Sequence, residues 1–465
     1  MALYSDEDLS VFKNSIEGIM KNIGDIVLNN YAPTKKEMTE IQKILLKYAK
    51  DNKRKMYGGF ALHLAIVNKD AKGSFYKNEE LYSKDLDLYS PEPLHDLITI
   101  CDMLHEKGYT HIYAREAIHS ETYTLEVNKH AYCDFSYVPK NIYNKIPFIQ
   151  IDGYYITYPY FMEIDYLKMF IDPILSSYRW EKSFERFYLL QKYYPIKFSR
   201  NSLNIKSKLE NVVYDELENF VTNNKSIALT GFYVYNIYQK VSKIDKKYIK
   251  NIRLPFFELV SIDYENDVKK ILDILTKICD KDKIKINEYY PFFTFLNHRT
   301  EILYDDNVIV KIYKNIHNLC FSYVVYDKKY IGSFLYNLRM CLVNAIYERT
   351  NDNREMEDMY YDMASHLIQM RNYYFEVTDN NVFSKTLFQD FISECMGFTQ
   401  NDKIDHDDMF KKKKRVVFKY TPNETKIDIS KWYFSNTSGN KIHNSKNYQI
   451  HFENGEMDYH LVDEQ

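Results

Sequence analysis

Hydrophobic positions in the first part of the chain follow helical spacing in some segments and strand spacing in others. In residues 36–50, apolar side chains recur at three- to four-residue intervals, which predicts a helix with one buried face. Residues 84–89 alternate between apolar and polar side chains, which predicts a strand. The predicted helices are 36–50, 60–67 and 95–107, and the predicted strands are 84–89, 122–127 and 131–138. Because an antiparallel strand pair stands among helices, the order indicates an α+β or mixed α/β fold, not a doubly wound dehydrogenase.

Three aspartates and a glycine pair form the main candidate for a chemical site. Gly58-Gly59 stands at a turn into a helix, where bare backbone can approach a phosphate and helix-start N–H groups favour anions. Asp85 and Asp87 are two positions apart on a strand, so both carboxylates point to one face. Asp134 lies in an apolar strand, where a lone carboxylate is costly unless it is paired or metal-bound. This set predicts a two-metal phosphoryl-transfer site.

Each residue of this set receives a role in that hypothesis. Asp85 and Asp87 would bind both divalent ions, Mg²⁺ or Mn²⁺. Asp134 would bind the ion that activates the attacking hydroxyl, or act as the base for that hydroxyl. The glycines would hold the β- and γ-phosphates of a nucleotide. Taken alone, the glycine pair is also explained by an ordinary turn, and the aspartate pair by a surface strand.

A long helix is predicted from Asp172 to about Tyr194. Asp172 suits the N-cap and Pro173 the first helical position. Helical spacing sorts its side chains into an apolar face, Trp180, Phe184 and Phe187, and a basic face, Arg179, Lys182 and Arg186. The apolar face is expected to lie in the core. The basic face would neutralise triphosphate or primer charge, and a solvated helix face is the alternative.

The motif Gly58-Gly59, Asp85-x-Asp87 and Asp134 resembles that of the polymerase-β-like nucleotidyltransferase superfamily. The sequence around these residues, and the block 172–190, resemble the poly(A) polymerase catalytic subunits of poxviruses and giant DNA viruses. The resemblance is good over residues 50–200 and looser elsewhere. One departure is the long gap between Gly59 and Asp85, which makes residues 69–83 an insertion relative to the usual spacing.

This resemblance implies a template-independent poly(A) polymerase that adds AMP from ATP to the 3′-hydroxyl of viral mRNA, with two Mg²⁺ or Mn²⁺ ions. It implies a nucleotidyltransferase domain, a helical linker and a second, degenerate nucleotidyltransferase-like domain. It also implies a homodimer or a separate processivity subunit, and a location in the cytoplasmic viral factory or the virion. A CCA-adding or oligoadenylate-forming enzyme and a non-catalytic RNA-binding scaffold remain as alternatives.

A second segment of the chain resembles the motif, which supports the presence of a second, degenerate domain. The alignment matches Thr230-Gly231 to Gly58-Gly59 and Phe256-x-Glu258 to Asp85-x-Asp87. One remaining acid cannot hold two metal ions, so the second copy is expected to be structural, with chance similarity as the alternative. The predicted organisation is a helical extension (1–50), a catalytic domain with its following helices (51–200), the degenerate domain (201–400) and a polar, basic segment (401–465).

Charge and cysteine content narrow the remaining possibilities. The formal net charge of −3 excludes a globally basic nucleic-acid coat, so a polyanion must meet a local patch. The densest basic run is a candidate RNA contact or a solvated loop, and comprises Lys411, Lys412, Lys413, Lys414 and Arg415.

The six cysteines show no CxxC pair and are predicted to be reduced, buried thiols of a cytosolic-type protein. No signal peptide and no membrane contact are expected, because no apolar run approaches the ~20 residues of a span.

Overall fold

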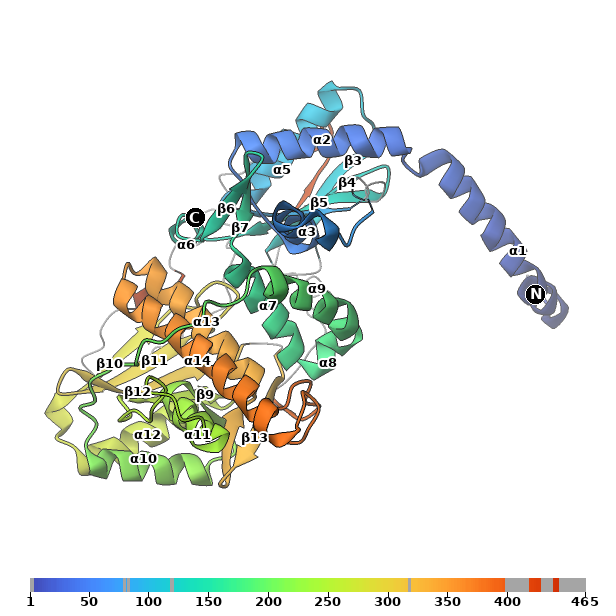
Figure 1. Ribbon diagram of the computed structural model, residues 1–465. Helices are drawn as coiled ribbons and strands as arrows, with labels where there is room; N and C mark the ends of the chain where they lie inside the picture. Colours follow the sequence, from blue (N-terminus) through green and yellow to red (C-terminus); the bar gives the residue numbers. More distant parts are fainter. Residues whose placement is uncertain are drawn as a thin grey trace, which may run out of the picture.

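Two mixed β-sheets, each flanked by helices, organise the chain (Figure 1). The computed structural model describes residues 4–77, 81, 84–117, 121–316, 319–397, 418–427 and 438–442. Helices and strands interleave along the sequence, and both sheets contain parallel and antiparallel pairs. The α+β class expected from the hydrophobic pattern is therefore confirmed.

The first sheet has eight strands in the order β16-β3-β4-β5-β2-β1-β7-β6. Its strands are β1 (Lys55–Tyr57), β2 (Leu86–Ser90), β3 (Ile112–Glu116), β4 (Thr122–Val127), β5 (His130–Tyr137), β6 (Phe148–Ile151), β7 (Tyr154–Thr157) and β16 (Lys419–Tyr420). The helices of this part are α2 (Lys35–Asp51), α3 (Gly58–Lys69), the 3₁₀ helix η1 (Ala71–Gly73), α5 (Pro93–Glu106) and α6 (Lys140–Tyr143). The predicted helices and strands of residues 36–138 are thus confirmed, with boundaries shifted by a few residues.

The second sheet has nine strands in the order β15-β13-β14-β8-β9-β12-β11-β10-β17. Its strands are β8 (Ile227–Thr230), β9 (Phe257–Ser261), β10 (Ile284–Tyr289), β11 (Arg299–Tyr304), β12 (Asn307–Lys314), β13 (Phe321–Tyr326), β14 (Lys329–Gly332), β15 (Cys395–Met396) and β17 (Lys441–Ile442). Its helices are α10 (Asn211–Asn223), α11 (Gly231–Ser242), α12 (Tyr264–Ile278), η3 (Lys281–Lys283), α13 (Phe334–Thr350) and α14 (Arg354–Thr378). The described parts of residues 401–465 add one strand to each sheet.

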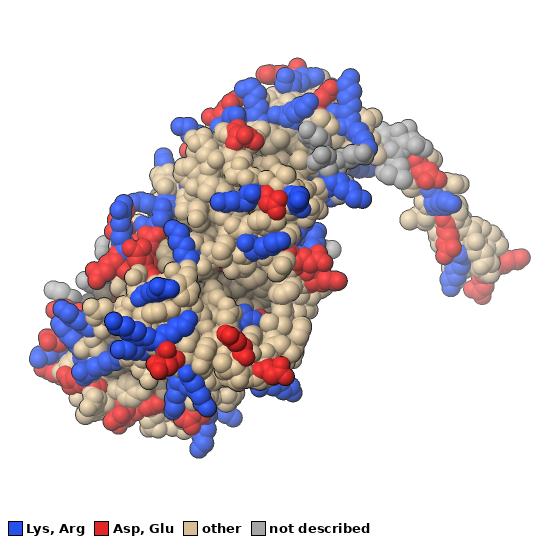
Figure 2. Space-filling model, viewed as in Figure 1, with Lys and Arg blue, Asp and Glu red and all other residues tan. Residues whose placement is uncertain are grey.

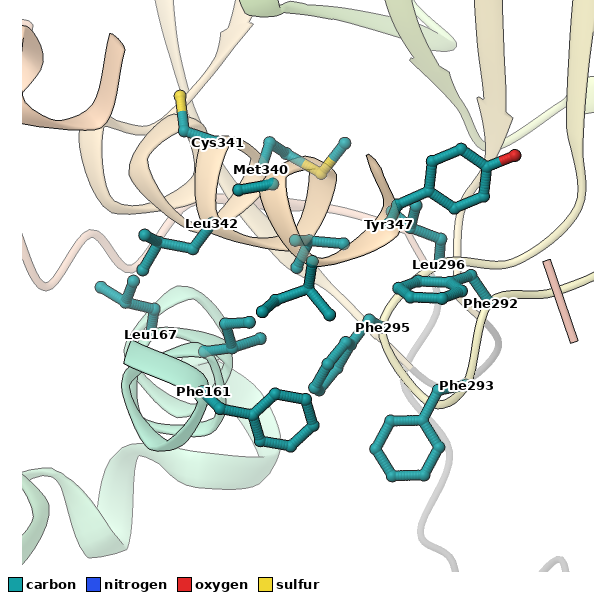
Figure 3. Packing of buried hydrophobic residues seen from close by; sticks show 14 of the residues in the cluster. Phe161, Leu167, Phe292, Phe293, Phe295, Leu296, Met340, Cys341, Leu342 and Tyr347 are labelled. Atoms are coloured by element: carbon teal, nitrogen blue, oxygen red, sulfur yellow. The ribbon is translucent and has the colours of Figure 1, made fainter. Parts of the chain in front are cut away.

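A continuous hydrophobic core joins the two sheets through α7 (Pro159–Ile171) and α13. Figure 3 shows Phe161 and Leu167 of α7 on the side of that helix near α13, with Phe295 from the loop between β10 and β11 beside Phe161. The ring centroids of Phe161 and Phe295 are 5.2 Å apart. Phe161 also contacts Tyr89 of β2, at 5.8 Å between ring centroids. The strand that carries the aspartate pair is therefore anchored to the second sheet through aromatic packing.

The helix predicted from Asp172 to Tyr194 is divided in the structure. It consists of α8 (Pro173–Ser176), the 3₁₀ helix η2 (Ser177–Arg179) and α9 (Trp180–Tyr193). Asp172 caps α8 as predicted, because its side chain accepts hydrogen bonds from the backbone of Ile174 and Leu175.

The expected core face of this helix was wrong in part. Phe184 is exposed and Trp180 only half-buried, whereas Ser183 and Leu190 are buried. The buried face of α9 is centred on Ser183 and Leu190, which leaves Trp180 and Phe187 half-buried and Phe184 exposed.

The prediction that all six cysteines are reduced and buried was also wrong. Cys320 and Cys395 form a disulfide, and Cys279 is only half-buried. The disulfide follows from the pairing of β13 with β15, which places Cys395 opposite Ser322. The two cysteines are 75 residues apart in sequence, so their spacing carries no sign of this contact.

The first helix, α1 (Asp6–Tyr31), projects away from the rest of the molecule (Figure 1). Its side chains from Asp6 to Ile26 are exposed, apart from the half-exposed Ile16. By contrast, α2 buries Ile41, Leu45 and Tyr48 in the core beneath the first sheet. Within the described residues, every helix is too short or too polar to cross a membrane.

Candidate active site

Three neighbouring strands of the first sheet bring the aspartates together. β2 runs parallel to β5 with Asp87 opposite Asp134, and antiparallel to β1 with Asp87 opposite Tyr57. Opposite residues in a ladder point to the same face, so Asp87 and Asp134 share one side of the sheet. Asp85 directly precedes β2, and its charge interacts with that of Asp87. The sequence prediction of three carboxylates on adjacent strands therefore describes the arrangement observed.

The turn between β1 and α3 places Gly58 directly against Asp87. Gly58 has a φ of +70°, and a Cβ atom there would lie 1.9 Å from Asp87 Oδ2. Only glycine satisfies both the left-handed backbone and this close approach. The next residue, Gly59, donates its backbone N–H to the Asp87 carboxylate. The glycine pair thus fixes the orientation of Asp87 at the start of α3.

Negative charge accumulates beside the central strands β2 and β5 without full compensation. Burial, followed by the charges of Asp85 and Asp134, raises the pKa of Asp87 to about 8, although Arg186 and the Gly59 N–H act in the opposite direction. Asp134 is half-buried, and its Oδ1 accepts a hydrogen bond from Thr124 Oγ1 at 2.6 Å. The Asp134 carboxylate is therefore positioned by β4 as well as by its own strand, β5.

The carboxylate oxygens of Asp85, Asp87 and Asp134 are suitable ligands for a hard divalent cation. Carboxylate oxygens are the side-chain ligands of Mg²⁺ and Mn²⁺, and a cation would relieve the repulsion that raises the pKa of Asp87. In the part of the chain that the structure describes, no three His, Cys, Asp or Glu side chains are arranged to hold a metal ion by themselves.

The basic face of α9 lies beside these carboxylates. Arg186 interacts with the charge of Asp87, and Lys182 with that of Asp85. The clustering of Arg186, Arg179 and Lys84 around Lys182 lowers the pKa of the Lys182 ammonium, Arg186 having the largest effect. Concentrated positive charge next to a carboxylate cluster is suited to a polyanionic ligand such as a triphosphate.

Tyr76, in the insertion between α3 and β2, was not identified from the sequence. Its hydroxyl accepts a hydrogen bond from Arg186 Nη2 at 2.8 Å. A Cβ atom on Gly59 would lie 2.5 Å from the Tyr76 hydroxyl and 3.1 Å from Arg186 Nη1. Arg186 also lies over the rings of Phe75 and Tyr76, at 5.5 and 5.7 Å from their centroids. Phe75 and Tyr76 therefore lie beside the glycine turn and position Arg186 there.

Replacing Tyr76 with Phe is expected to raise KM for the nucleotide about tenfold, with little change in kcat. The substitution keeps the ring but removes a hydrogen bond to a charged group, an interaction of about 1.5 kcal/mol. Tyr188→Phe is the control, since Tyr188 is an exposed tyrosine on the same helix as Arg186. Steady-state kinetics over a range of nucleotide concentrations measure the effect. Equal KM values for both variants would contradict this role of Tyr76.

The second sheet repeats the same local arrangement with different chemistry. β8 is antiparallel to β9 with Thr230 opposite Glu258, and β9 is parallel to β12 with Glu258 opposite Lys311. Glu258 therefore corresponds to Asp87, and Lys311 to Asp134. Lys311 Nζ lies 4.5 Å from the ring centroid of Phe256, which stands at the position of Asp85. A lysine and a phenylalanine thus replace two of the three carboxylates.

The glycine alignment predicted for the second copy was wrong by one residue. Gly231 has a φ of +65°, and a Cβ there would lie 1.7 Å from Glu258 Oε2. Phe232 donates its backbone N–H to Glu258, as Gly59 does to Asp87. Gly231 therefore corresponds to Gly58, and Phe232 to Gly59. The alignment by sequence matched Gly231 to the second glycine of the pair. The feature that both sheets share is a glycine with a left-handed backbone next to the acid.

The basic run Lys411–Arg415 lies outside the described residues. Of the other predicted site residues, the structure brings together the three aspartates, the two glycines and the cations Lys182 and Arg186. Arg179 contributes its charge near Lys182 and lies 5.9 Å from the ring centroid of Tyr178.

Comparisons with known proteins agree with this geometry. The family model described as "Poly(A) polymerase catalytic subunit" matches residues 43–176, and a model for the C-terminal part of the catalytic subunit of the APMV poly(A) polymerase matches residues 189–452. A protein of Acanthamoeba polyphaga mimivirus named as a poly(A) polymerase catalytic subunit is 32% identical, over 94% of this chain and 83% of its own length. A protein of the same name from African swine fever virus (isolate Pig/Kenya/KEN-50/1950) is 25% identical, over 65% of this chain and 71% of its own.

A solved structure extends the similarity to the whole fold. The crystal structure of the Megavirus polyadenylate synthase matches with a TM-score of 0.84 and 31% sequence identity, covering 100% of this chain and 98% of the Megavirus chain. This chain therefore belongs to the family of viral poly(A) polymerase catalytic subunits and is a polynucleotide adenylyltransferase.

Proposed function

We propose that the enzyme adds AMP from ATP to the 3′-hydroxyl of messenger RNA, without a template, at the site formed by Asp85, Asp87 and Asp134. The observation that carries the proposal is the register of β1, β2 and β5. It places two aspartates opposite each other and a positive-φ glycine against one of them. Family membership supports the nucleotide and the polymeric product, and the carboxylate geometry supports the reaction type.

The reaction forms one bond and breaks one. The 3′-oxygen of the RNA attacks the α-phosphorus of ATP, the bond from that phosphorus to the β-phosphate oxygen breaks, and pyrophosphate leaves. Two divalent ions bound by Asp85, Asp87 and Asp134 would lower the pKa of the hydroxyl and neutralise charge on the leaving group. Asp134 is the acceptor for the hydroxyl proton, and Thr124 keeps its carboxylate in place.

The residues around the carboxylates would orient the nucleotide. Gly58 and Gly59 bring the start of α3, where helix N–H groups favour anions, against Asp87 and Arg186, so the β- and γ-phosphates would bind next to the glycine turn. Arg186 and Lys182 would neutralise the same phosphates from the other side, with Arg186 held by Tyr76. Such positioning is a major part of catalysis in phosphoryl transfer.

We further propose that the enzyme self-associates through α1. Apolar side chains on this helix follow alternating three- and four-residue steps, as in a heptad repeat, and comprise Leu9, Phe12, Ile16, Ile19, Ile23 and Ile26. All are exposed except Ile16, which is half-exposed. A helix of this kind gains most of its stability by packing its apolar face, and an identical α1 offers a matching seam. A separate processivity subunit is the alternative partner.

Charge placed on the α1 seam is expected to convert a dimer into a monomer. The double variant Phe12→Glu/Ile19→Glu puts two carboxylates into the proposed contact, at positions that are 57% and 49% exposed within one chain. Val11→Glu is the control, because Val11 is 60% exposed and lies on the opposite side of the helix. Light scattering should give twice 55.9 kDa for the wild type and the control, and 55.9 kDa for the double variant. A monomeric wild type, or a dimeric double variant, would refute contact through α1.

A further inference from the structure

Two segments beside α14 form a surface that is much more basic than the protein as a whole. Residues 195–209 and 239–253 contain ten Lys or Arg and one acid, Asp245, while the entire chain has a net charge of −3. The basic residues are Lys197, Arg200, Lys206, Lys208, Lys240, Lys243, Lys246, Lys247, Lys250 and Arg253. All are exposed except the partly buried Lys246. We call the exposed part of these two segments the Phe198 surface.

The two segments lie against each other. Ser207 Oγ donates a hydrogen bond to the Leu254 carbonyl at 2.5 Å, and Arg253 Nη2 donates to the Leu209 carbonyl at 3.5 Å. The segment after α9 crosses in front of α13 and α14 in Figure 1, and Figure 2 shows Lys and Arg side chains gathered over this part of the molecule.

An exposed aromatic ring lies among these cations. The side chain of Phe198 is 58% exposed. Arg200 and Lys246 lie 5.6 and 5.4 Å from its ring centroid, and the ring of Tyr248 is 6.2 Å away and nearly perpendicular. Exposed phenylalanine gains little from the hydrophobic effect, but a ring between cations is suited to stack on a base while the cations contact phosphates.

A buried glutamine on α14 fixes this arrangement. Gln369 is 8% exposed, and its Oε1 accepts hydrogen bonds from Lys246 Nζ at 3.2 Å and Tyr248 Oη at 2.8 Å. Its Nε2 donates to the carbonyl of Ser199 at 3.0 Å, and the Ser199 N–H donates to Ser365 Oγ at 2.8 Å. Both segments are therefore anchored to the same helix, and Phe198 is presented to solvent by a backbone that is itself hydrogen-bonded.

The chain connects this surface directly to the candidate active site. Arg186, next to Asp87, and Phe198 are separated by seven residues of α9 and four residues of the following segment. At about 1.5 Å per helical residue and at most about 3.6 Å per extended residue, their Cα atoms are within about 30 Å. A single strand whose 3′ end lies at the carboxylates is therefore able to extend to the Phe198 surface.

We infer that the Phe198 surface binds single-stranded RNA behind the 3′ end, with a base stacked on Phe198 and phosphates contacted by Arg200, Lys246 and Lys247. The inference rests on the proposed function for the identity of the polymer. RNA would use both the ring, by base stacking, and the cations, by phosphate contacts. An acidic protein segment would use the cations but not the ring.

Binding of fluorescently labelled oligoadenylate RNA, measured by anisotropy at several salt concentrations, tests the inference. Phe198→Leu is expected to weaken binding about tenfold, and Phe198→Trp to retain it, because only the latter keeps a stacking ring. The double reversal Arg200→Glu/Lys247→Glu should reduce the slope of log K against log salt by about 1.4. The matched control, Lys269→Glu/Lys277→Glu on α12, changes the net charge equally and should leave the slope unchanged.

The outcomes separate this inference from the proposed function. Wild-type affinity and slope in the Phe198 surface variants, or equal losses in the α12 control, would overturn the inference. Loss of affinity in Arg200→Glu/Lys247→Glu with full affinity in Phe198→Leu would identify a charge-only contact and overturn the stacking. AMP addition to a trinucleotide primer, which offers this surface the fewest bases and phosphates, should change least in every variant. Failure of the wild type to extend any primer would instead refute the proposed function, whatever the binding result.

Discussion

Asparagine in place of Asp87, or of Asp85, is expected to lower the rate of AMP transfer about a thousandfold. A metal-binding carboxylate contributes several kcal/mol to the stabilisation of charge in the transition state, and each 1.4 kcal/mol corresponds to a factor of ten. Asparagine has almost the same shape as aspartate but carries no charge. Single-turnover extension of a labelled RNA primer at saturating ATP isolates the chemical step. Retention of more than about one per cent of the wild-type rate by both variants would contradict the metal-binding assignment.

Glu258→Gln is the matched control for Asp87→Asn. Glu258 occupies the same register position in the second sheet, next to an equivalent glycine, but faces Lys311 and Phe256 instead of two aspartates. The same loss of one carboxylate charge should therefore leave transfer nearly unchanged. A loss comparable to that of Asp87→Asn, in a folded protein, would mean that the second sheet takes part in catalysis.

Thermal unfolding of the metal-free Asp87→Asn variant checks that the fold survives. The folded-state pKa of Asp87, about 8, lies above the ordinary aspartate value of 3.8, so between these values the folded state binds the proton more tightly than the unfolded state. The metal-free wild type should therefore lose stability as pH rises from about 4 to 8. The asparagine variant lacks this titration, so at pH 8 it should melt at or above the wild-type temperature.

Alanine at Gly58 is expected to impair both folding stability and catalysis. A left-handed residue with a Cβ costs about 1–2 kcal/mol, and the new methyl group would lie 1.9 Å from Asp87 Oδ2. The carboxylate must move away, and a displacement of about 1 Å in a catalytic group lowers rates about a hundredfold. Denaturant unfolding and single-turnover primer extension measure the two effects.

Gly231→Ala separates the two effects of Gly58→Ala. Gly231 has nearly the same φ and the same proximity to an acid, so the substitution should destabilise the protein by a similar amount. Its transfer rate should change little as long as the protein is folded. Wild-type transfer by Gly58→Ala, or an equal loss of rate in folded Gly231→Ala, would remove the glycine from the catalytic arrangement.

The carboxylate arrangement was predictable from sequence because it depends on local periodicity. Residues that are two positions apart on a strand point to the same face of the sheet. The spacing of Asp85 and Asp87 therefore predicted that their carboxylates lie close together. Asp134 was identifiable because a carboxylate between Cys133 and Phe135 is costly without a partner. The start of α3 followed from the glycines and the apolar residues after them.

Contacts that depend on long-range pairing could not be predicted in the same way. The disulfide between Cys320 and Cys395 depends on the pairing of β13 with β15, which no spacing in the sequence indicates. The contact of Tyr76 with Arg186 joins residues 110 positions apart, and an insertion of unknown conformation contains one of them. The exposure of Phe184 depends on which side of α9 packs against the rest of the chain, a face centred on Ser183 and Leu190 that the spacing of the aromatic residues does not indicate.

The most direct test of the account is primer extension with each of the four nucleoside triphosphates supplied separately, in the presence of Mg²⁺ or Mn²⁺. Wild-type enzyme and the Asp87→Asn and Glu258→Gln variants are compared on the same labelled single-stranded RNA. The proposed function predicts long tails with ATP and either metal ion, no tails after chelation, none from Asp87→Asn, and wild-type tails from Glu258→Gln. Tails made by Asp87→Asn at the wild-type rate, or no extension of RNA by the wild type with any nucleotide, would contradict it.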